Sequence, residues 1–180
     1  MFLDNSLCFN TGGWNTPSAA ITATVDGPVV VDVTGAGVGN APAMINGFPA
    51  TNTSIGSDWG AGDGLAFPYF YMTVTTTGTG AGTVTVSISA APDNGSYSAG
   101  TYTQLYASTA FVGTTLVKGS VLLVPLPPTL WTIGEALPRF YKVTYTVSGT
   151  VGALKVISGL TINPQIATLG GNYNSNFLAV

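Results

Sequence analysis

Side chains able to do acid–base, nucleophilic or metal chemistry are few in this 180-residue sequence, which has seven acidic residues, one cysteine and no histidine. Histidine is the usual general acid or base at neutral pH, so Ser-His-Asp and Cys-His catalytic arrangements are excluded. A zinc site of Cys and His ligands is excluded too. Cys8 has no partner for an internal disulfide and no imidazole to activate it, so we interpret it as a small buried hydrophobe or a tolerated thiol.

Paired carboxylates are the remaining option for catalysis, because glycoside hydrolases cleave a bond that lies between two acids. Asp26 precedes Gly27-Pro28 and Asp93 precedes Asn94-Gly95, so both are better explained as turn formers. The other acids are scattered along the chain. We therefore predict that the protein is not an enzyme and uses no cofactor.

The segment Ser57–Gly64 is similar to a calcium loop, because Asp58 and Asp63 flank a run rich in glycine. Calcium takes roughly six to eight oxygen ligands, and this spacing matches neither an EF-hand nor a repeated Gly-rich array. We predict an Asp-Gly turn without a metal, and whether Asp58 and Asp63 hold calcium stays open. The glycine clusters at 35–39 and 78–82 precede no helix and no Lys-Ser/Thr pair, which argues against a phosphate loop.

Charge is scarce over the whole sequence. Only 6 % of the residues are charged, against roughly 25 % in an average domain. The net charge of −3 and the lack of any basic run argue against nucleic acid as a partner, because few phosphates would be neutralised. A nearly neutral surface of Thr, Ser, Asn and Gly favours association with other subunits.

Nothing in the sequence predicts a membrane or secretory segment. No run approaches the roughly 18 consecutive apolar residues of a membrane span. The first residues lack the positive start and long apolar run of a secretory signal. With a single cysteine, we expect the protein to be made and kept in a reducing cytoplasm or in an assembly built there.

Alternation of apolar and polar residues predicts strands at 83–89, 139–147 and 154–162. A short loop, Ser148–Gly152, separates the last two, and we predict that they pair as a hairpin, with Gly159 easing a bend or bulge. Further strands are expected at 29–33, 66–76, 101–106, 111–117 and 121–124. The side chains expected to face inward are Val84, Val86, Ile88, Tyr141, Val143, Tyr145 and Val147.

Strands at roughly ten-residue spacing, with no amphipathic helix, predict an all-β fold, a jelly-roll β-sandwich with an extended N-terminal arm and a C-terminal tail. We assign residues 1–20 to a docking arm, 21–165 to the jelly-roll domain and 166–180 to the tail. The domain includes a Gly-rich loop at about 34–64, too long for an ordinary hairpin and therefore a candidate for function.

Aromatic and apolar side chains in the arm, the long loop and the tail are candidate contacts with a partner, because tryptophan and tyrosine are enriched at interface hot spots. For the N-terminal segment, an ordinary first strand of the sheet is the alternative. Trp131, after Pro127-Pro128, is also able to anchor a partner. Consecutive aromatics in Tyr69–Tyr71 face opposite ways, which favours core packing plus an interface over a stacking platform. The candidate contact residues are Phe2, Leu3, Leu7, Phe9, Trp14, Trp59, Tyr173, Phe177 and Leu178.

Three features occur in a distinctive order: the start Met1-Phe-Leu-Asp-Asn5, the strand pair near 67–76 and 83–89, and the segment Leu137-Pro-Arg-Phe-Tyr-Lys-Val-Thr-Tyr-Thr-Val-Ser-Gly-Thr150. In these the sequence resembles the capsid cement (decoration) proteins of tailed bacteriophages, specifically the Bbp16-like family. The likeness covers the N-terminal arm and roughly residues 64–163. The insert at about 34–63 and the tail after Asn163 have no counterpart.

The resemblance implies a jelly-roll subunit that binds the outer surface of an icosahedral HK97-like phage capsid and cements adjacent capsomers. It implies the major capsid protein as partner, a homo-oligomer with a dimer favoured over a trimer, no cofactor and no catalysis. The expected location is the virion, after synthesis in the cytoplasm of the bacterial host. Low charge suits this role, because burying an unpaired ion at an interface costs several kcal/mol.

Two other classes of protein compete with this interpretation. A virion or cell-surface β-sandwich module that binds a host receptor or a glycan would also be rich in Thr and Gly and poor in charge. A jelly-roll enzyme such as a polysaccharide hydrolase is disfavoured by the missing histidine and the scattered acids.

Overall fold

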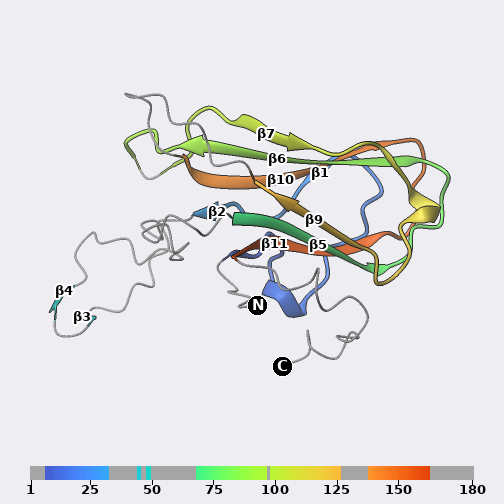
Figure 1. Cartoon of the computed structure of the whole chain (residues 1–180), viewed down its shortest axis with the longest axis horizontal. Helices are drawn as coiled ribbons and strands as arrows, with labels where there is room; N and C mark the ends of the chain where they lie inside the picture. Colours follow the sequence, from blue (N-terminus) through green and yellow to red (C-terminus); the bar gives the residue numbers. More distant parts are fainter. Residues whose placement is uncertain are drawn as a thin grey trace.

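Two antiparallel sheets pack face to face in the computed structural model of the chain (Figure 1). The structure describes residues 7–32, 44–45, 48–49, 68–96, 98–126 and 138–162. The all-β prediction is confirmed, and the helical structure of this part consists of 3-10 turns such as η2 (Gly13–Asn15) and η3 (Gly113–Thr115).

The larger sheet is built around two long strands, β6 (Thr83–Pro92) and β10 (Pro138–Ser148), which pair along almost their whole length. Shorter strands border them: β1 (Val25–Asp26) and β2 (Val31–Asp32) pair with β10, while β7 (Thr103–Ala107) and β8 (Phe111–Val112) pair with β6. The smaller sheet has the order β11 (Lys155–Ile162), β5 (Pro68–Thr76), β9 (Val121–Pro125). Inside the predicted long loop, β3 (Met44–Ile45) pairs with β4 (Phe48–Pro49).

The core lies between the sheets and follows the predicted alternation. From β6, the side chains of Val84, Val86 and Ile88 are buried, as are Tyr141, Val143 and Tyr145 from β10, and Val147 is partly buried. The smaller sheet contributes the opposite wall: Phe70, Met72, Val74, Val124, Val156 and Leu160. The prediction of which residues face inward is thus confirmed for these strands.

The predicted hairpin between 139–147 and 154–162 is wrong. The strands β10 and β11 lie in different sheets: β10 pairs with β6, and β11 pairs with β5. Paired strands lie about 5 Å apart whereas packed sheets lie about 10 Å apart. The connection 148–155 therefore crosses the thickness of the sandwich, and alternation alone does not distinguish such a crossing from a hairpin.

The connections 76–83, 112–121 and 148–155 all cross between the sheets at one end of the sandwich, which we call the arch end (Figure 1, right). Backbone hydrogen bonds join them directly: the N–H of Gly80 donates to the carbonyl of Val151 (2.8 Å) and the N–H of Gly113 donates to the carbonyl of Gly82 (2.8 Å). A Cβ at Gly80 would lie 2.0 Å from the carbonyl oxygen of Thr150. Glycine is therefore required for this close approach.

One of these connections also corrects the predicted strand 111–117. Only Phe111–Val112 form a strand, because the chain turns into η3 at Gly113 and crosses to the smaller sheet. The short strand β1 was not predicted. No β-bulge lies at Gly159, because the register shift in β11 falls between Lys155 and Val156.

Candidate binding surface

Three of the candidate contact residues, Leu7, Phe9 and Trp14, are buried within the chain. Leu7 and Phe9 belong to the main core, where the Phe9 ring lies 6.3 Å from that of Phe70, and Trp14 covers the outer face of the smaller sheet. Their prediction as exposed contacts is therefore corrected, since apolar side chains next to the open edge of a sheet are more stable against that sheet than in water. The other candidates, Phe2, Leu3, Trp59, Tyr173, Phe177 and Leu178, lie outside the described residues.

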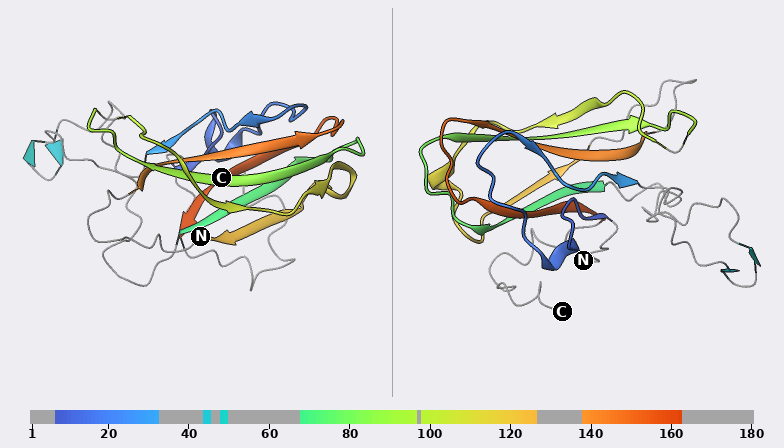
Figure 2. Two further views of the ribbon diagram at one scale, coloured as in Figure 1. Left: turned by 90° about the horizontal axis from the view of Figure 1, so that it is seen from above. Right: turned by 180° about the vertical axis from the view of Figure 1, so that it is seen from behind.

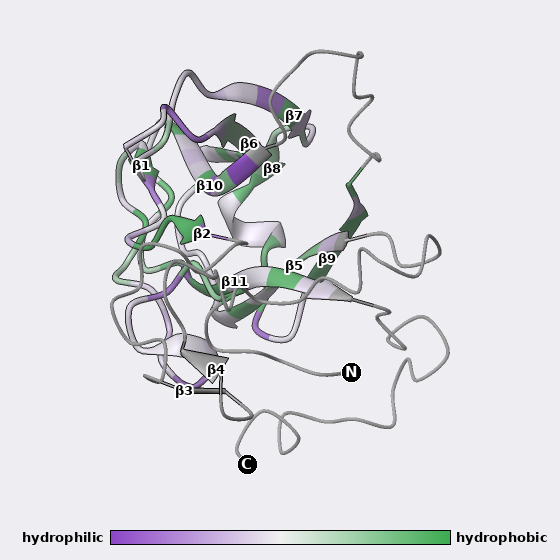
Figure 3. Cartoon of the chain, turned by 90° about the vertical axis from the view of Figure 1, so that its left-hand side faces the viewer, coloured by the Kyte–Doolittle hydropathy of each residue, from purple (hydrophilic) through white to green (hydrophobic). Residues whose placement is uncertain are grey.

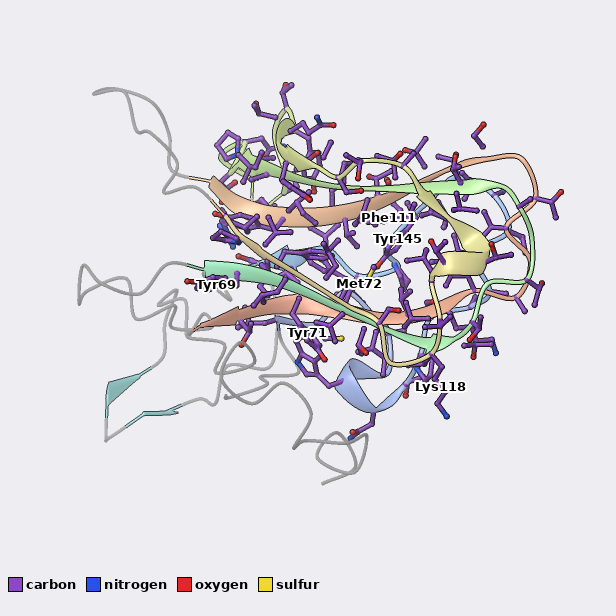
Figure 4. The ribbon with its side chains drawn as sticks, turned by 45° about the vertical axis from the view of Figure 1, so that its right-hand side comes forward. Tyr69, Tyr71, Met72, Phe111, Lys118 and Tyr145 are labelled. Atoms are coloured by element: carbon purple, nitrogen blue, oxygen red, sulfur yellow. The ribbon has the colours of Figure 1, made fainter. Side chains whose placement is uncertain are left out.

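The position of Trp14 explains why residue 159, in β11, is a glycine. A Cβ at Gly159 would lie 2.5 Å from the Trp14 ring, so the indole packs directly against the strand backbone. The ring of Tyr71 lies 5.8 Å from Trp14 on the same face of the sheet (Figure 4 labels Tyr71). Of the three aromatics at 69–71, Phe70 thus enters the main core and Tyr71 enters this second cluster, while Tyr69 is half-buried.

The free edge of β11 is closed by the segment that follows Leu7. Phe9 donates its N–H to the carbonyl of Ser158 (2.9 Å), and Ile21 donates its N–H to the carbonyl of Leu154 (2.8 Å). Between them the Asn10 side chain acts like a strand residue: Oδ1 accepts from the N–H of Ser158 (3.0 Å) and Nδ2 donates to the carbonyl of Val156 (3.1 Å). The sequence contains no signal for this use of an asparagine side chain.

The same segment then joins the larger sheet. Gly27 donates its N–H to the carbonyl of Val143 (2.8 Å), and β1 and β2 pair with β10. Residues 8–32 thus close one long side of the sandwich, which we call the closed side (Figure 2, left, blue segment). The predicted docking arm, 1–20, is from Leu7 onward part of the fold.

A small polar cluster lies inside the sandwich near Cys8. The hydroxyl of Tyr145 hydrogen-bonds to Oγ of Ser158 (2.6 Å), which links the two sheets, and the Cys8 thiol donates to the carbonyl of Ser158 (3.3 Å). Burial raises the pKa of Cys8 from 9.0 to about 11, so the thiol is protonated at neutral pH. This agrees with the interpretation of Cys8 as a buried hydrophobe.

Opposite the arch end, an arginine holds three parts of the larger sheet together. Arg139, on β10, makes a bidentate pair with Asp32 on β2 (2.9 and 2.8 Å) and a further hydrogen bond to Asp93, which follows β6. Asp93 also accepts from the N–H of Gly95 (2.8 Å), so its predicted role in a turn is confirmed. The ion pairs are local in space but distant in sequence, and alternation does not predict them.

Asp26 is a strand residue rather than the predicted turn former. It ends β1, where its carboxylate accepts from the Thr144 hydroxyl (2.5 Å) and from Lys142 (3.2 Å). These contacts hold the pKa of Asp26 below 3.8, with the Thr144 hydrogen bond as the main cause. In the part of the chain that the structure describes, every acid thus has a cationic partner, which leaves no pair of free carboxylates there for glycoside cleavage.

Several described strands end beside Arg139, and we call this end of the sandwich the open end. Asp32 is paired with Phe140, and Pro68 with Ile162, so the described residues on either side of 33–67 lie at this end. Pro125, Pro138 and Ile162, the strand ends next to residues 127–137 and 163–180 in the sequence, lie at the same end (Figure 3 views this end along the strands). These segments carry Trp59, Trp131, Tyr173, Phe177 and Leu178 in the sequence.

Within the described ranges, no group of His, Cys, Asp or Glu side chains is arranged to hold a metal. Asp58 and Asp63 fall outside those ranges. Nor does any helix there have the length and apolarity to cross a membrane. No family model matches the chain, and none of the curated proteins matches it.

Proposed function

We propose that this protein is a structural virion protein that binds the outer surface of an icosahedral HK97-like capsid and cements adjacent capsomers. The observation that carries the proposal is the difference between the two ends of the sandwich. Backbone hydrogen bonds join the connections at the arch end, whereas the strand ends next to the aromatic-bearing parts of the sequence gather at the open end. A sandwich with several chain segments joined to one end is suited to bridging neighbouring capsid subunits. Its partner in this role is the major capsid protein.

The strand order supports the jelly-roll architecture that the resemblance implies. Strands pair from the outside of the sequence inward: Cys8 with β11, β1 and β2 with β10, β5 with β9, and β6 with β7 and β8. This is the order of one long antiparallel hairpin rolled up so that successive strands fall in opposite sheets. Jelly rolls are double-sheet structures of this kind and are common in viral capsid proteins.

The pairing of acidic with basic side chains supports the same role. Asp26, Asp32 and Asp93 are held by Lys142 and Arg139 within the sandwich, so these ions do not have to be desolvated without a partner at an interface. Many copies on one shell would add avidity without any catalytic chemistry. The protein acts in this proposal by buried area alone and has no cofactor.

The test mixes the purified chain with empty shells assembled from the major capsid protein of the same genome. We expect the chain to cosediment with the shells and to raise the temperature at which they come apart. Deleting residues 1–6, replacing Trp59→Ala, or deleting residues 166–180 separates the contributions of the three candidate segments, and Trp14→Phe serves as a core control. Absence from the shell fraction, together with specific binding on a glycan array, would instead establish the alternative, a receptor- or glycan-binding module.

A further inference from the structure

The turn after β6, at the open end, has the sequence Asp93-Asn94-Gly95-Ser96 (Figure 1, left). An asparagine side chain loses its amide when the backbone nitrogen of the next residue attacks the amide carbon, and a glycine there has no side chain to obstruct the attack. Among the described residues, Asn10 and Asn15 are followed by threonine, and Asn94 alone is followed by glycine. The surroundings of this turn therefore decide whether the attack occurs.

The attacking nitrogen faces a base. Gly95 donates its N–H to Oδ1 of Asp93 (2.8 Å). A general base has to lie within about 2.6–3.2 Å of the atom from which it takes a proton, and this carboxylate does. The second carboxylate oxygen of Asp93 accepts from Arg139, which holds the carboxylate in this orientation.

The oxygen of the Asn94 amide faces a donor. Ser96 donates its backbone N–H to Oδ1 of Asn94 (2.9 Å). Negative charge develops on this oxygen when the amide carbon is attacked, and a donor already in place stabilises that charge. Asn94 and Gly95 are both exposed, so water reaches the amide and ammonia is free to leave.

Backbone hydrogen bonds across the turn hold these groups in position. Asn94 donates its N–H to the carbonyl of Ser98 (2.9 Å). Gly100 donates its N–H to the carbonyl of Pro92 (2.8 Å). Groups that the fold already holds close together react faster than the same groups on a freely moving chain, because less entropy is lost on the way to the transition state.

We propose that Asn94 converts to aspartate and isoaspartate within the folded chain, with Asp93 as the general base. The Gly95 nitrogen gives its proton to the Asp93 carboxylate and forms a bond to the amide carbon of Asn94. The proton passes to the amide nitrogen, whose bond to that carbon breaks, so that ammonia leaves and a cyclic succinimide remains. One water then opens the ring and gives aspartate where the new bond breaks, or isoaspartate where the original peptide bond breaks.

The product changes the open end in two ways. A carboxylate replaces a neutral amide next to Asp93 and Arg139, which adds one negative charge to a net charge of −3. Isoaspartate also lengthens the main chain of the turn by one carbon. The reaction needs neither a capsid nor a partner, so it goes beyond the proposed function.

Timed incubation of the purified full chain at neutral pH tests the reaction. A chymotryptic digest of each sample, cut at Tyr71 and Tyr97, separates Asn94 from the other Asn-Gly pair, Asn46-Gly47, and mass spectrometry follows the loss of the amide. We expect Asn94 to react at least about tenfold faster in the folded chain than in the chain unfolded by guanidinium chloride. Asn15, which is exposed but precedes Thr16, is the internal control and should keep its amide.

Asp93→Ser removes the base and keeps an oxygen that is able to accept the hydrogen bond of the turn. We expect this variant to react at least about tenfold more slowly than the wild type when both are folded, and at the same rate when both are unfolded. Circular dichroism checks that the variant folds.

The pH dependence of the wild-type rate is a second measurement, and it needs no variant. In the unfolded chain hydroxide is the base, so the rate should rise with pH. In the folded chain the base belongs to the turn, so the rate should change little near neutral pH.

Three results would each overturn the proposal. The first is a slower reaction of Asn94 in the folded chain than in the unfolded chain. The second is a folded Asp93→Ser variant that reacts as fast as the wild type, and the third is a folded rate that rises with pH as steeply as the unfolded rate. Because no shell is present, the capsid experiment decides the proposed function separately.

Discussion

At the scale of single residues, Asn10 shows how a side chain replaces a strand. Its amide meets one donor and one acceptor on the edge of β11, where backbone amides of a neighbouring strand would otherwise lie. The side chain is buried, so water does not supply these bonds when the amide is removed.

We expect Asn10→Ala to lower the free energy of unfolding by about 2 kcal/mol, because the buried N–H of Ser158 would lose its acceptor. Chemical denaturation measures the change. Asn15→Ala is the control, since Asn15 is exposed and a surface substitution typically changes stability by less than about 0.5 kcal/mol. Equal effects of the two variants would show that the Asn10 amide does not hold the edge.

The buried thiol of Cys8 makes stability depend on alkaline pH. The unfolded chain ionises Cys8 near pH 9.0, whereas the folded chain keeps it protonated up to about pH 11. The folded state therefore binds more protons in this window, and stability, complete below pH 9.0, should fall as the pH rises through it. Burial raises the pKa of Tyr141 to about 12 and extends the loss upward.

Denaturation at a series of pH values checks this prediction. Cys8→Ala should reduce the loss of stability between pH 9 and pH 10 by about 1 kcal/mol, the equivalent of about one pKa unit. The comparison uses the slope against pH, so a constant effect of Cys8→Ala on packing does not enter. An unchanged slope would mean that the thiol is reachable by water.

At the scale of elements, the three connections at the arch end show why glycine is needed at positions such as Gly80. The connections 76–83, 112–121 and 148–155 come into direct backbone contact, as the hydrogen bonds of Gly80, Gly82 and Gly113 show. At the open end, Arg139 on β10 hydrogen-bonds to Asp32 on β2 and to Asp93 in the turn after β6, so it joins these three segments.

Gly80→Ala should destabilise the fold by at least about 2 kcal/mol, because its Cβ would overlap the Thr150 carbonyl and force the connections 76–83 and 148–155 apart. Gly95→Ala is the control: Gly95 has a φ of 87°, but nothing lies within 4 Å of the place that an added methyl group would take, so only backbone strain of about 1 kcal/mol is expected. Thermal and chemical unfolding rank the two variants. A smaller loss for Gly80→Ala than for Gly95→Ala would contradict the close packing of the arches.

Arg139→Met should lower the free energy of unfolding by about 3 kcal/mol, because it leaves the largely buried carboxylate of Asp32 without its cation. Lys142→Met is the matched comparison. The Lys142–Asp26 pair is much more exposed, and such pairs contribute about 0–1 kcal/mol. Equal losses in the free energy of unfolding for the two substitutions would show that the Arg139 ion pairs do not stabilise this end of the sheet.

At the scale of the whole molecule, the segment 7–32 joins the two sheets along one side of the sandwich. It fills the core with Phe9, covers the smaller sheet with Trp14 and then pairs with the larger sheet. Any experiment on the predicted docking arm therefore has to separate residues 1–6 from those that follow.

Deleting residues 1–12 should abolish cooperative folding. The deletion removes Leu7, Phe9 and Asn10, and a buried phenylalanine alone contributes about 3–5 kcal/mol, against a total stability of about 5–15 kcal/mol for a typical domain. Deleting residues 1–6 removes none of the described sandwich and should leave its thermal unfolding cooperative. Differential scanning calorimetry distinguishes the two deletions. If the 1–12 deletion unfolds at the same temperature as the full chain, this segment does not belong to the core.

Alternation in the sequence determined the long strands β6, β10 and β11 and the inner face of each, as the burial of Val84, Val86 and Ile88 shows for β6. It did so because side chains in a strand point alternately to opposite faces, a property of each segment by itself. None of the candidate contacts Phe2, Leu3, Trp59, Tyr173, Phe177 and Leu178 is tested, because they lie outside the described residues.

Only the tertiary structure decided which sheet each strand joins and what the N-terminal segment does. Strands β10 and β11 are neighbours in sequence but lie in opposite sheets, and Leu7, Phe9 and Trp14 are core residues rather than exposed contacts. Asn10 meets Val156 and Ser158, and Arg139 meets Asp32, across separations of more than a hundred residues. Alternation tells which way a side chain faces but not which distant segment will cover it, because that depends on how the whole chain buries its edges.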